Sequence, residues 1–241
     1  MEKEYIMNIG TLYLIPTPLG EPGHVDPLPT GNLNILNSID TFIVEEIRTA
    51  RRFLRWCGIT KPIDSLTFLE LNEHTPEQET VKYLDGALQG QNLGLLSEAG
   101  LPCIADPGNY VVRQAHLRGI RVIPLIGPSS LMLALMASGL NGQQFLFHGY
   151  LPIKPHEREL ALRGLEKDVK TSGRTQIFIE TPYRNKALLE SIIRCCHPEL
   201  LLCIAASITT PEEFISTRPV RMWKSDYPEL NKKPTVFLFG S

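Results

Sequence analysis

Short apolar runs alternate with segments of helical period along the first half of the chain. The run TLYLI is rich in apolar and β-branched residues and is stopped by Pro16, Pro18 and Gly20, which predicts a short buried strand entering a long turn. Three later runs have the same character. Strands are therefore expected at residues 11–15, 41–44, 92–96 and 121–125, and helices at 33–39, 49–56, 75–88 and 110–118.

Capping signals mark several helix ends. Thr75 offers a capping hydroxyl, Pro76 stands at the first helical position and Gln78 follows three residues after the cap, a typical helix start. Gly58 and Gly119 follow helical segments and suit the left-handed backbone that commonly closes a helix. We therefore expect helix boundaries at these positions.

The second half of the chain repeats the alternation. Helices are expected at 130–137, 157–165 and 185–194, and strands near 145 and at 176–179, 200–205 and 235–239. Alternating strands and helices predict an α/β fold with a largely parallel sheet and helices on its faces. Single cores usually hold about 100–200 residues. We therefore expect two domains, 1–119 and 120–241, each a mainly parallel or mixed sheet flanked by helices.

The composition is that of an ordinary globular protein, with 43% hydrophobic and 21% charged residues. A net charge of −2 and a pI near 6.3 exclude a general attraction of nucleic acid by the whole surface, so any RNA contact must be local. No apolar run approaches the ~20 residues of a membrane span, and the N-terminal MEKEYIMNIG lacks a long apolar core. We expect neither an anchor nor a signal peptide.

The cysteine pattern indicates reduced thiols. The chain has five cysteines, an odd number, and Cys195 and Cys196 are adjacent. Most of them stand among apolar residues, which fits free thiols and a cytoplasmic protein better than disulfides. No CxxC or HxxxH pair accompanies them, so we expect no metal site.

Three loops that follow strands are candidate ligand-binding segments. They read PTPLGEPG, SEAGLPCIADPG and IGPSS. Small residues and prolines leave backbone N–H and C=O groups open to a ligand, and in parallel sheets ligands bind beyond the carboxyl ends of the strands. The alternative is that each loop is only a tight turn. No GxGxxG follows the first strand, which argues against a dinucleotide cofactor.

Six strings of the chain resemble those of one enzyme family, in the same order and with similar spacing. They are GTLYLIPTPLGE, VEEIRTARRFLRWCGI, LLSEAGLPCIADPG, VIPLIGPSSLMLALMASGL, FLFHGYLP and IFIETPYR. The chain resembles the ribosomal small-subunit RNA cytidine 2'-O-methyltransferases, a branch of the tetrapyrrole-methylase superfamily. The resemblance implies two α/β domains with S-adenosylmethionine in the cleft between them, usually in a homodimer.

The resemblance also implies, position by position, which residues hold this cofactor. Pro18 would lie beneath it at the end of the first strand. Ser129 and Ser130 would cap the first helix of the second domain, where amide groups can meet the cofactor's carboxylate. The remaining positions would line the methionine and ribose, with Ala99, Gly100, Leu101, Ile104 and Ala105, or close over the adenine, with Glu180, Thr181, Ala206, Pro234, Thr235 and Val236.

Methyl transfer from a sulfonium needs mainly an oriented acceptor whose proton can leave. Candidate bases are Glu98, in the second loop, and Glu45 or Glu46, at the end of a strand beside Arg48. A ribose hydroxyl is so weak an acid that a carboxylate would act more by hydrogen bonding than by complete proton removal. The alternative for the pair at 45 and 46 is a surface ion-pair cluster at a helix start.

Arginines are concentrated in the segment RTARRFLRW. Phosphates could be bound there by Arg48, Arg51, Arg52 and Arg55. Trp56 in the same segment could stack a base. The alternative is an amphipathic helix whose Phe53, Leu54 and Trp56 point inward while the arginines are solvated.

The chain departs from the RNA-modifying branch at the substrate side. Ala206 and Ser207 stand where an Arg-Glu pair is usual, no lysine follows Thr209, and Glu98 and Leu101 replace an aspartate and a small polar residue. The leading hypothesis is methylation of a ribose hydroxyl in ribosomal RNA. Methylation of a small molecule such as a tetrapyrrole, or cofactor binding without turnover, are the alternatives.

Overall fold

The chain folds into two compact units. The computed structural model describes residues 9–20, 28–72 and 74–241. Of these, 9–18 and 28–128 form the N-terminal unit, and 19–20 and 129–241 form the C-terminal unit. The first eight residues, on which part of the signal-peptide prediction rests, lie outside the described residues.

The N-terminal unit is built on a parallel five-stranded sheet of order β3-β2-β4-β1-β5. Its strands are β1 (Thr11–Ile15), β2 (Thr41–Val44), β3 (Thr67–Glu70), β4 (Leu93–Leu96) and β5 (Arg121–Pro124). Each neighbouring pair is parallel, with Leu12 in register with Leu93 on one side and Val122 on the other. The sheet confirms the four predicted strands and adds β3, which the apolar pattern missed because its residues are only partly buried or exposed.

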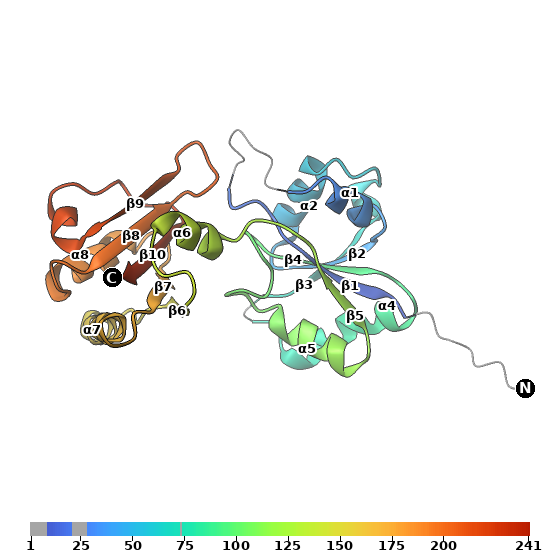
Figure 1. The fold of residues 1–241 in the computed structure, drawn as a ribbon. Helices are drawn as coiled ribbons and strands as arrows, with labels where there is room; N and C mark the ends of the chain where they lie inside the picture. The colour runs from blue at the N-terminus through green and yellow to red at the C-terminus, as the bar shows by residue number, and fades with distance from the viewer. Residues whose placement is uncertain (1–8, 21–27, 73) are drawn as a thin grey trace, which may run out of the picture. The chain divides into compact units, whose positions relative to one another are not determined.

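Helices cover both faces of this sheet, as Figure 1 shows for α2 and α5. One face carries α1 (Gly31–Leu36) and α2 (Ile47–Trp56), whose Leu36 and Leu54 join Phe42 in one core cluster. The other carries α4 (Asp85–Leu88) and α5 (Asn109–Leu117). The short elements of this unit are η1 (Ile63–Ser65), α3 (Glu77–Thr80) and η2 (Lys82–Leu84).

The prediction of one helix from Thr75 to about residue 88 is wrong, because the segment consists of three short pieces, α3, η2 and α4. The Thr75 hydroxyl accepts the backbone N–H of Asn72 at 3.0 Å, so it closes the preceding turn and does not cap a helix. Pro76 occupies the N-cap position without a side-chain hydrogen bond. The helix end at Gly119 is confirmed, with φ of 68°.

The C-terminal unit contains a mixed sheet of order β6-β7-β10-β8-β9. Its strands are β6 (Phe145–Tyr150), β7 (Thr175–Ile179), β8 (Leu201–Ala206), β9 (Phe214–Pro219) and β10 (Thr235–Gly240). Only β6 and β7 pair in parallel; the other three pairs are antiparallel. The mixed sheet confirms the expected fold class, whereas β9 was not anticipated, because its side chains are uniformly half-buried and show no alternation.

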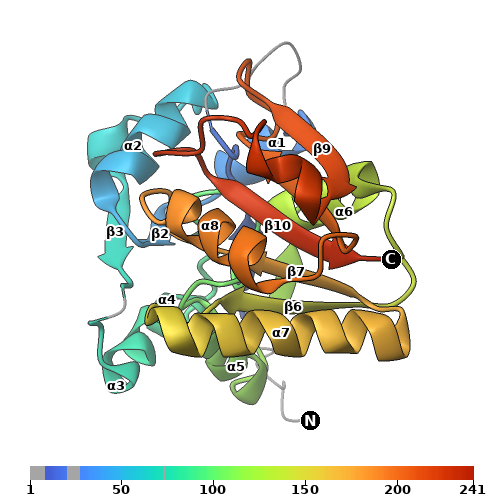
Figure 2. The same ribbon diagram turned by 90° about the vertical axis from the view of Figure 1, so that its left-hand side faces the viewer.

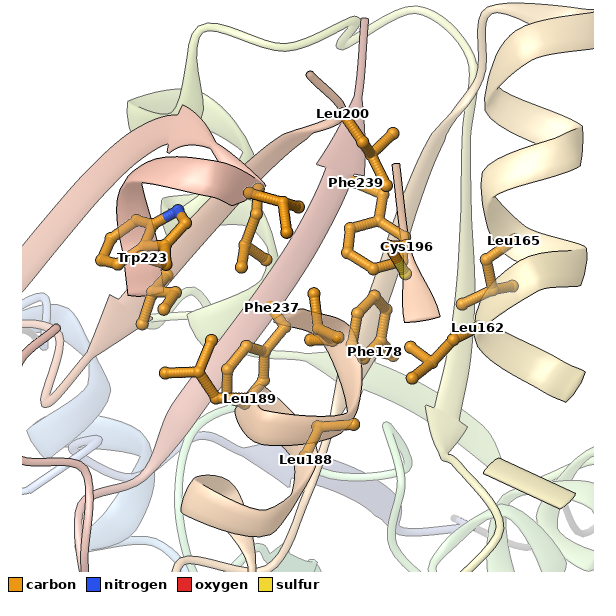
Figure 3. Packing of buried hydrophobic residues seen from close by; sticks show 14 of the residues in the cluster. Leu162, Leu165, Phe178, Leu188, Leu189, Cys196, Leu200, Trp223, Phe237 and Phe239 are labelled. Carbon is orange, nitrogen blue, oxygen red and sulfur yellow. The ribbon is translucent and has the colours of Figure 1, made fainter. Parts of the chain in front are cut away.

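Alternation along β10 assigns its side chains to two cores. Val236 and Leu238 pack with α6 (Ser130–Ser138), and Phe237 and Phe239 pack on the opposite face. That face carries α7 (Pro155–Ser172), α8 (Asn185–Cys195) and η3 (Val220–Lys224), as Figure 2 shows for both helices. Figure 3 shows Phe178 beside Phe237 and Phe239, with ring centroids 5.9 and 5.0 Å away. Burying each ring contributes about 1.5–3 kcal/mol.

The division between the units falls after Pro128, whereas the sequence suggested a boundary after Gly119. The difference arises because β5 pairs with β1 and so belongs to the first sheet. The residues that follow β5 lead into α6, which packs in the C-terminal unit. Within the described residues, no helix is long and apolar enough to cross a membrane.

Candidate active site

The loops after β1 and β4 are tied together at the carboxyl edge of the first sheet. Thr17 N–H donates to Gly100 O at 3.0 Å, and Gly100 N–H donates back to Thr17 O at 3.1 Å. The Ser97 hydroxyl also donates to Gly100 O, at 2.6 Å. Gly100 has φ of 80°, a left-handed conformation that glycine adopts without strain. The two loops therefore form one braced surface.

The loop after β5 reaches the same edge. A Cβ atom on Gly127 would lie 2.3 Å from Pro16 Cγ, so the absence of a side chain at Gly127 permits this approach. Asn32 Nδ2 donates to Ile126 O at 3.0 Å and fixes the loop against α1. The prediction that the three loops converge is confirmed for the parts that belong to the N-terminal unit, residues 16–18, 97–108 and 126–128. Residues 21–23 of the first loop lie outside the described residues.

The loop after β4 combines strain with exposure. Cys103 and Ala105 have φ of 68° and 61°, a conformation that costs non-glycine residues energy. Ala99 and Ala105 are exposed, and Ile104 keeps half of its surface in contact with solvent. Strained backbone and exposed small or apolar side chains favour a loop shaped for a ligand.

Three carboxylates gather beyond the ends of β2 and β4. Burial, followed by the charges of Asp106 and Glu98, raises the pKa of Glu45 from 4.5 to about 7. Burial also raises the pKa of Asp106, although its Oδ1 accepts the Gly108 N–H at 2.7 Å. Near neutral pH, Glu45 is therefore divided between its protonated and ionised forms, as a proton acceptor should be.

The other two predicted bases have different surroundings. Glu98 is exposed and accepts the Thr49 hydroxyl at 2.7 Å. Glu46 is the N-cap of α2, and its carboxylate accepts the N–H groups of Arg48 at 2.8 Å and Thr49 at 3.0 Å. Thus Glu98 lies close enough for its charge to raise the pKa of Glu45, while the Glu46 carboxylate is occupied by the helix start.

The C-terminal unit brings most of its predicted cofactor residues to one end of its sheet. Thr235 is in register with Ala206, and Val236 with Ile179, the residue before Glu180. Ser207 N–H donates to Pro234 O at 2.9 Å, which joins the loop after β8 to the start of β10. Three separate segments therefore meet here.

Two buried acceptors at this end lack donors. Glu180 Oε1 accepts the Thr181 N–H at 2.6 Å and Arg184 NH2 at 2.7 Å, whereas Glu180 Oε2 is buried without a hydrogen bond. Asn185 Oδ1 is also buried and unbonded, although its Nδ2 donates to Thr235 Oγ1 at 3.2 Å. Buried acceptors of this kind are costly. Amino or hydroxyl groups, which an adenosine carries, would satisfy them, so the residues present fit the expected cofactor.

Ser129 and Ser130 stand at the start of α6, where the sequence predicts the cap of this helix. Ser129 is the N-cap, with its hydroxyl accepting the Met132 N–H at 3.4 Å. At the other end of the helix, Ser138 O accepts the Thr217 hydroxyl at 2.7 Å, and Leu140 abuts Gly240 at the end of β10. The first turn of α6 is thus directed away from the Gly240 end of the sheet, with N–H groups suited to an anion.

The four arginines of α2 are not equivalent. Arg48, Arg52 and Arg55 are exposed, lie at helical spacings of four and three residues, and make no ion pair in the described part of the chain. Arg51 instead pairs with Asp64 and lies 5.9 Å over the Phe68 ring. Sequence reasoning grouped all four as substrate contacts, but Arg51 is engaged within the unit.

Sequence reasoning missed Asp106, Arg184 and Asn185. Asp106 follows the loop glycine by six residues, and nothing in the string ADPG shows that its carboxyl comes close to Glu45. Arg184 follows Glu180 by four residues, a spacing that could have signalled the ion pair. The contact of Asn185 with Thr235 joins residues fifty positions apart, which local patterns cannot reveal.

Comparison with known proteins links these features to one family. The model of the tetrapyrrole (corrin/porphyrin) methylases matches residues 11–221. The chain is 33% identical over 211 residues to the ribosomal RNA small subunit methyltransferase I of Escherichia coli O157:H7, covering 88% of this chain and 70% of that protein. It is 32% identical over 232 residues to the enzyme of the same name from Pasteurella multocida (strain Pm70), covering 95% and 78%.

A solved structure shows the same fold. The methyltransferase CobJ superposes with a TM-score of 0.62 at 20% identity, covering 96% of this chain and 94% of CobJ. At this identity the likeness concerns the fold alone.

Proposed function

Because the chain belongs to the tetrapyrrole methylase family, we propose that it methylates a ribose 2'-hydroxyl of small-subunit ribosomal RNA. It is a methyltransferase whose methyl donor is S-adenosylmethionine. The main observation in favour of an RNA substrate is the row of exposed arginines on α2, Arg48, Arg52 and Arg55. Relatives that cover most of the chain are named as ribosomal RNA methyltransferases, which supports the same substrate.

The arginine row suits RNA better than a small molecule. Three guanidinium groups on one exposed helix face, without carboxylate partners in the described chain, form a local positive field on a protein of net charge −2. Phosphates are the usual partners of such a row. At Ala206 and Ser207, where the RNA-modifying branch carries charges, this chain offers none, so α2 must supply the contacts.

We assign the cofactor contacts to the positions expected from the sequence. In the N-terminal unit these are Pro18, Ala99, Gly100, Leu101, Ile104 and Ala105. In the C-terminal unit they are Ser129, Ser130, Glu180, Thr181, Ala206, Pro234, Thr235 and Val236. Asn185 joins them, because its Oδ1 and Glu180 Oε2 are the buried side-chain acceptors that lack donors within the described part of the chain. That the cofactor lies between the two units stays a prediction.

When bound, S-adenosylmethionine supplies an electrophilic methyl group. The residues of the chain must orient the acceptor hydroxyl and hold its proton. We assign the proton to Glu45, whose pKa of about 7 suits exchange near neutrality and is raised by burial, then by the charges of Asp106 and Glu98. Glu46 is left out, because it caps α2. A carboxylate that hydrogen bonds to the weakly acidic hydroxyl increases its nucleophilicity.

We also propose that the protein acts as a homodimer through β6. This strand is at an edge of the second sheet, and no other strand of the described chain pairs with its outer side. Phe145, Leu146 and Tyr150 on β6 are 37%, 42% and 55% exposed. A second copy could cover this apolar edge. Leu146→Lys should yield monomers in analytical ultracentrifugation, whereas Leu117→Lys on α5 should not; dimers that survive Leu146→Lys would contradict this interface.

A labelling experiment tests the proposed reaction. Purified protein is incubated with radiolabelled S-adenosylmethionine and small ribosomal subunits from a strain that lacks its gene, with a reduced tetrapyrrole in a parallel reaction. We expect label on one nucleotide of the subunit RNA. Label on the tetrapyrrole alone would favour the small-molecule substrate, and cofactor binding without transfer to either would contradict the activity. Action on ribosomal RNA would place the protein in the cytoplasm, in agreement with its five free cysteines.

A further inference from the structure

An apolar pocket lies between α1 and α2 in the N-terminal unit. It has a volume of about 150 Å³ and is open to solvent. Ile15 and Pro16 form its base at the end of β1, Leu33 its α1 side, and Phe53 and Trp56 its α2 side. The polar groups of its wall come from Thr30 and Asn32. Pro16 precedes Thr17, so the pocket adjoins the first of the converging loops.

Trp56 leaves part of its aromatic surface exposed to solvent. The residue is 46% exposed, and its ring stacks on Phe53 with centroids 6.3 Å apart and planes 27° apart. Leu54, between them in sequence, is fully buried and anchors this turn of α2 to the core. The Trp56 ring is therefore held by a rigid helix while part of it remains available for stacking.

The helix that carries Trp56 also carries positive charge. Arg52 and Arg55 precede Trp56 by four residues and one residue, so both belong to the same turn of α2, although neither lines the pocket itself. Arg48 extends the row, and the three span about 10 Å along the helix. An apolar peptide in this pocket would leave the arginines without partners, whereas a base in the pocket places its own phosphates beside them.

We propose that this pocket receives one unpaired nucleobase of the RNA substrate, stacked on Trp56, while Arg52 and Arg55 bind the adjoining phosphates. The inference rests on the proposed function and specifies how the RNA is held. The occupant is a base near the methylated nucleotide. Thr30 and Asn32 provide hydrogen-bonding groups at the wall, and the Asn32 amide is already oriented by its bond of 3.0 Å to Ile126 O. Such groups can discriminate between bases.

Tryptophan fluorescence tests the pocket directly. The chain has two tryptophans, and Trp223 is fully buried, so Trp56 is the residue whose emission a ligand can reach. A short single-stranded RNA copied from the methylated region should quench this emission. The same RNA, made abasic at the nucleotide whose base would enter the pocket, should bind with an unchanged salt dependence but quench the emission little. Equal quenching by both RNAs, or none by either despite binding, would overturn the proposal.

Variants separate the pocket from the arginine row. Base stacking of this kind changes affinity about 5- to 150-fold, so Trp56→Leu should weaken RNA binding within that range, and Trp56→Phe should restore most of it. Arg52→Ala should weaken binding and reduce the slope of log affinity against log salt by about 0.7. Arg121→Ala, an exposed arginine on β5, is the matched control and should change neither quantity.

The methylation assay distinguishes a failure of the pocket proposal from a failure of the proposed function. If the unaltered protein labels the small subunit and Trp56→Leu leaves the KM for the subunit unchanged, the pocket proposal fails while the function stands. If the unaltered protein labels no RNA, the proposed function itself fails. A rise in KM with kcat unchanged would support a base held before the chemical step.

Discussion

Replacing Glu45 by glutamine should abolish the pH dependence of methyl transfer near neutrality. Burial, Asp106 and Glu98 raise the pKa of Glu45 to about 7, and the ionised form accepts the proton, so the rate should increase as pH rises through this value and then level off. At pH 6 about a tenth of the Glu45 carboxyls are ionised. General-base assistance contributes about 10²–10⁴-fold, with the lower end suited to so weak an acid. Glu45→Gln should therefore lower kcat/KM about 100-fold at pH 8 and leave a flat profile.

A second variant tests the cause of the shift. Asp106→Asn removes the charge that, of the two acting on Glu45, raises its pKa more, while the new amide oxygen can still accept the Gly108 N–H. The midpoint of the pH profile should then move to lower pH. Asp85→Asn, at a carboxylate that pairs with Arg118, should leave the midpoint in place. The assay is single-turnover transfer to small subunits at saturating S-adenosylmethionine. Wild-type rates in Glu45→Gln, or an unmoved midpoint in Asp106→Asn, would refute the assignment.

Three further outcomes follow from the same geometry. The pKa of Glu45 is higher in the folded chain than its ordinary value of 4.5, so its contribution to stability is present below pH 4.5 and is lost as pH rises through about 7. Glu45→Gln should therefore raise the melting temperature at pH 8 but not at pH 4.5. Equal gains at both pH values would contradict this. Glu180→Gln should weaken S-adenosylmethionine binding about 10- to 150-fold in calorimetry, because a charged acceptor is lost. The control Glu190→Gln, on the exposed side of α8, should bind the cofactor normally. Equal cofactor affinities of the two variants would remove Glu180 from the site. Gly127→Ala should cost about 1–3 kcal/mol in denaturant unfolding, because its Cβ would lie 2.3 Å from Pro16, and unchanged stability would show that the loops can separate freely.

The sequence pattern predicted the strands whose burial leaves a clear apolar run. The strands β1, β2 and β4 were recognisable because their residues are buried or half-buried on both sides, as in a parallel sheet covered by helices. The edge strands β3 and β9 contain no fully buried residue and lack that signal. The pairing of β5 with β1, which moves the boundary to Pro128, depends on contacts more than a hundred residues apart.

In the candidate site, too, some features could be predicted from the sequence and others could not. Convergence of the loops could be predicted, because carboxyl ends of parallel strands share one edge. The function of each side chain could not, because it depends on neighbours distant in sequence or on backbone geometry. Arg51 is engaged by Asp64 and Phe68, and Glu46 by the amides that open α2. The burial of Glu45 and its proximity to Asp106, which together raise its pKa, appear only once β2 and β4 are paired.

Mapping the methyl group on the RNA would show whether the protein modifies a ribose hydroxyl. Small subunits from a strain lacking the gene are treated with the protein and S-adenosylmethionine, and their RNA is hydrolysed in alkali, which cannot cleave beside a methylated ribose. We expect one newly resistant position, absent when the arginines of α2 are replaced together. A methyl group found on a base, or on no nucleotide while a tetrapyrrole is methylated, would contradict it.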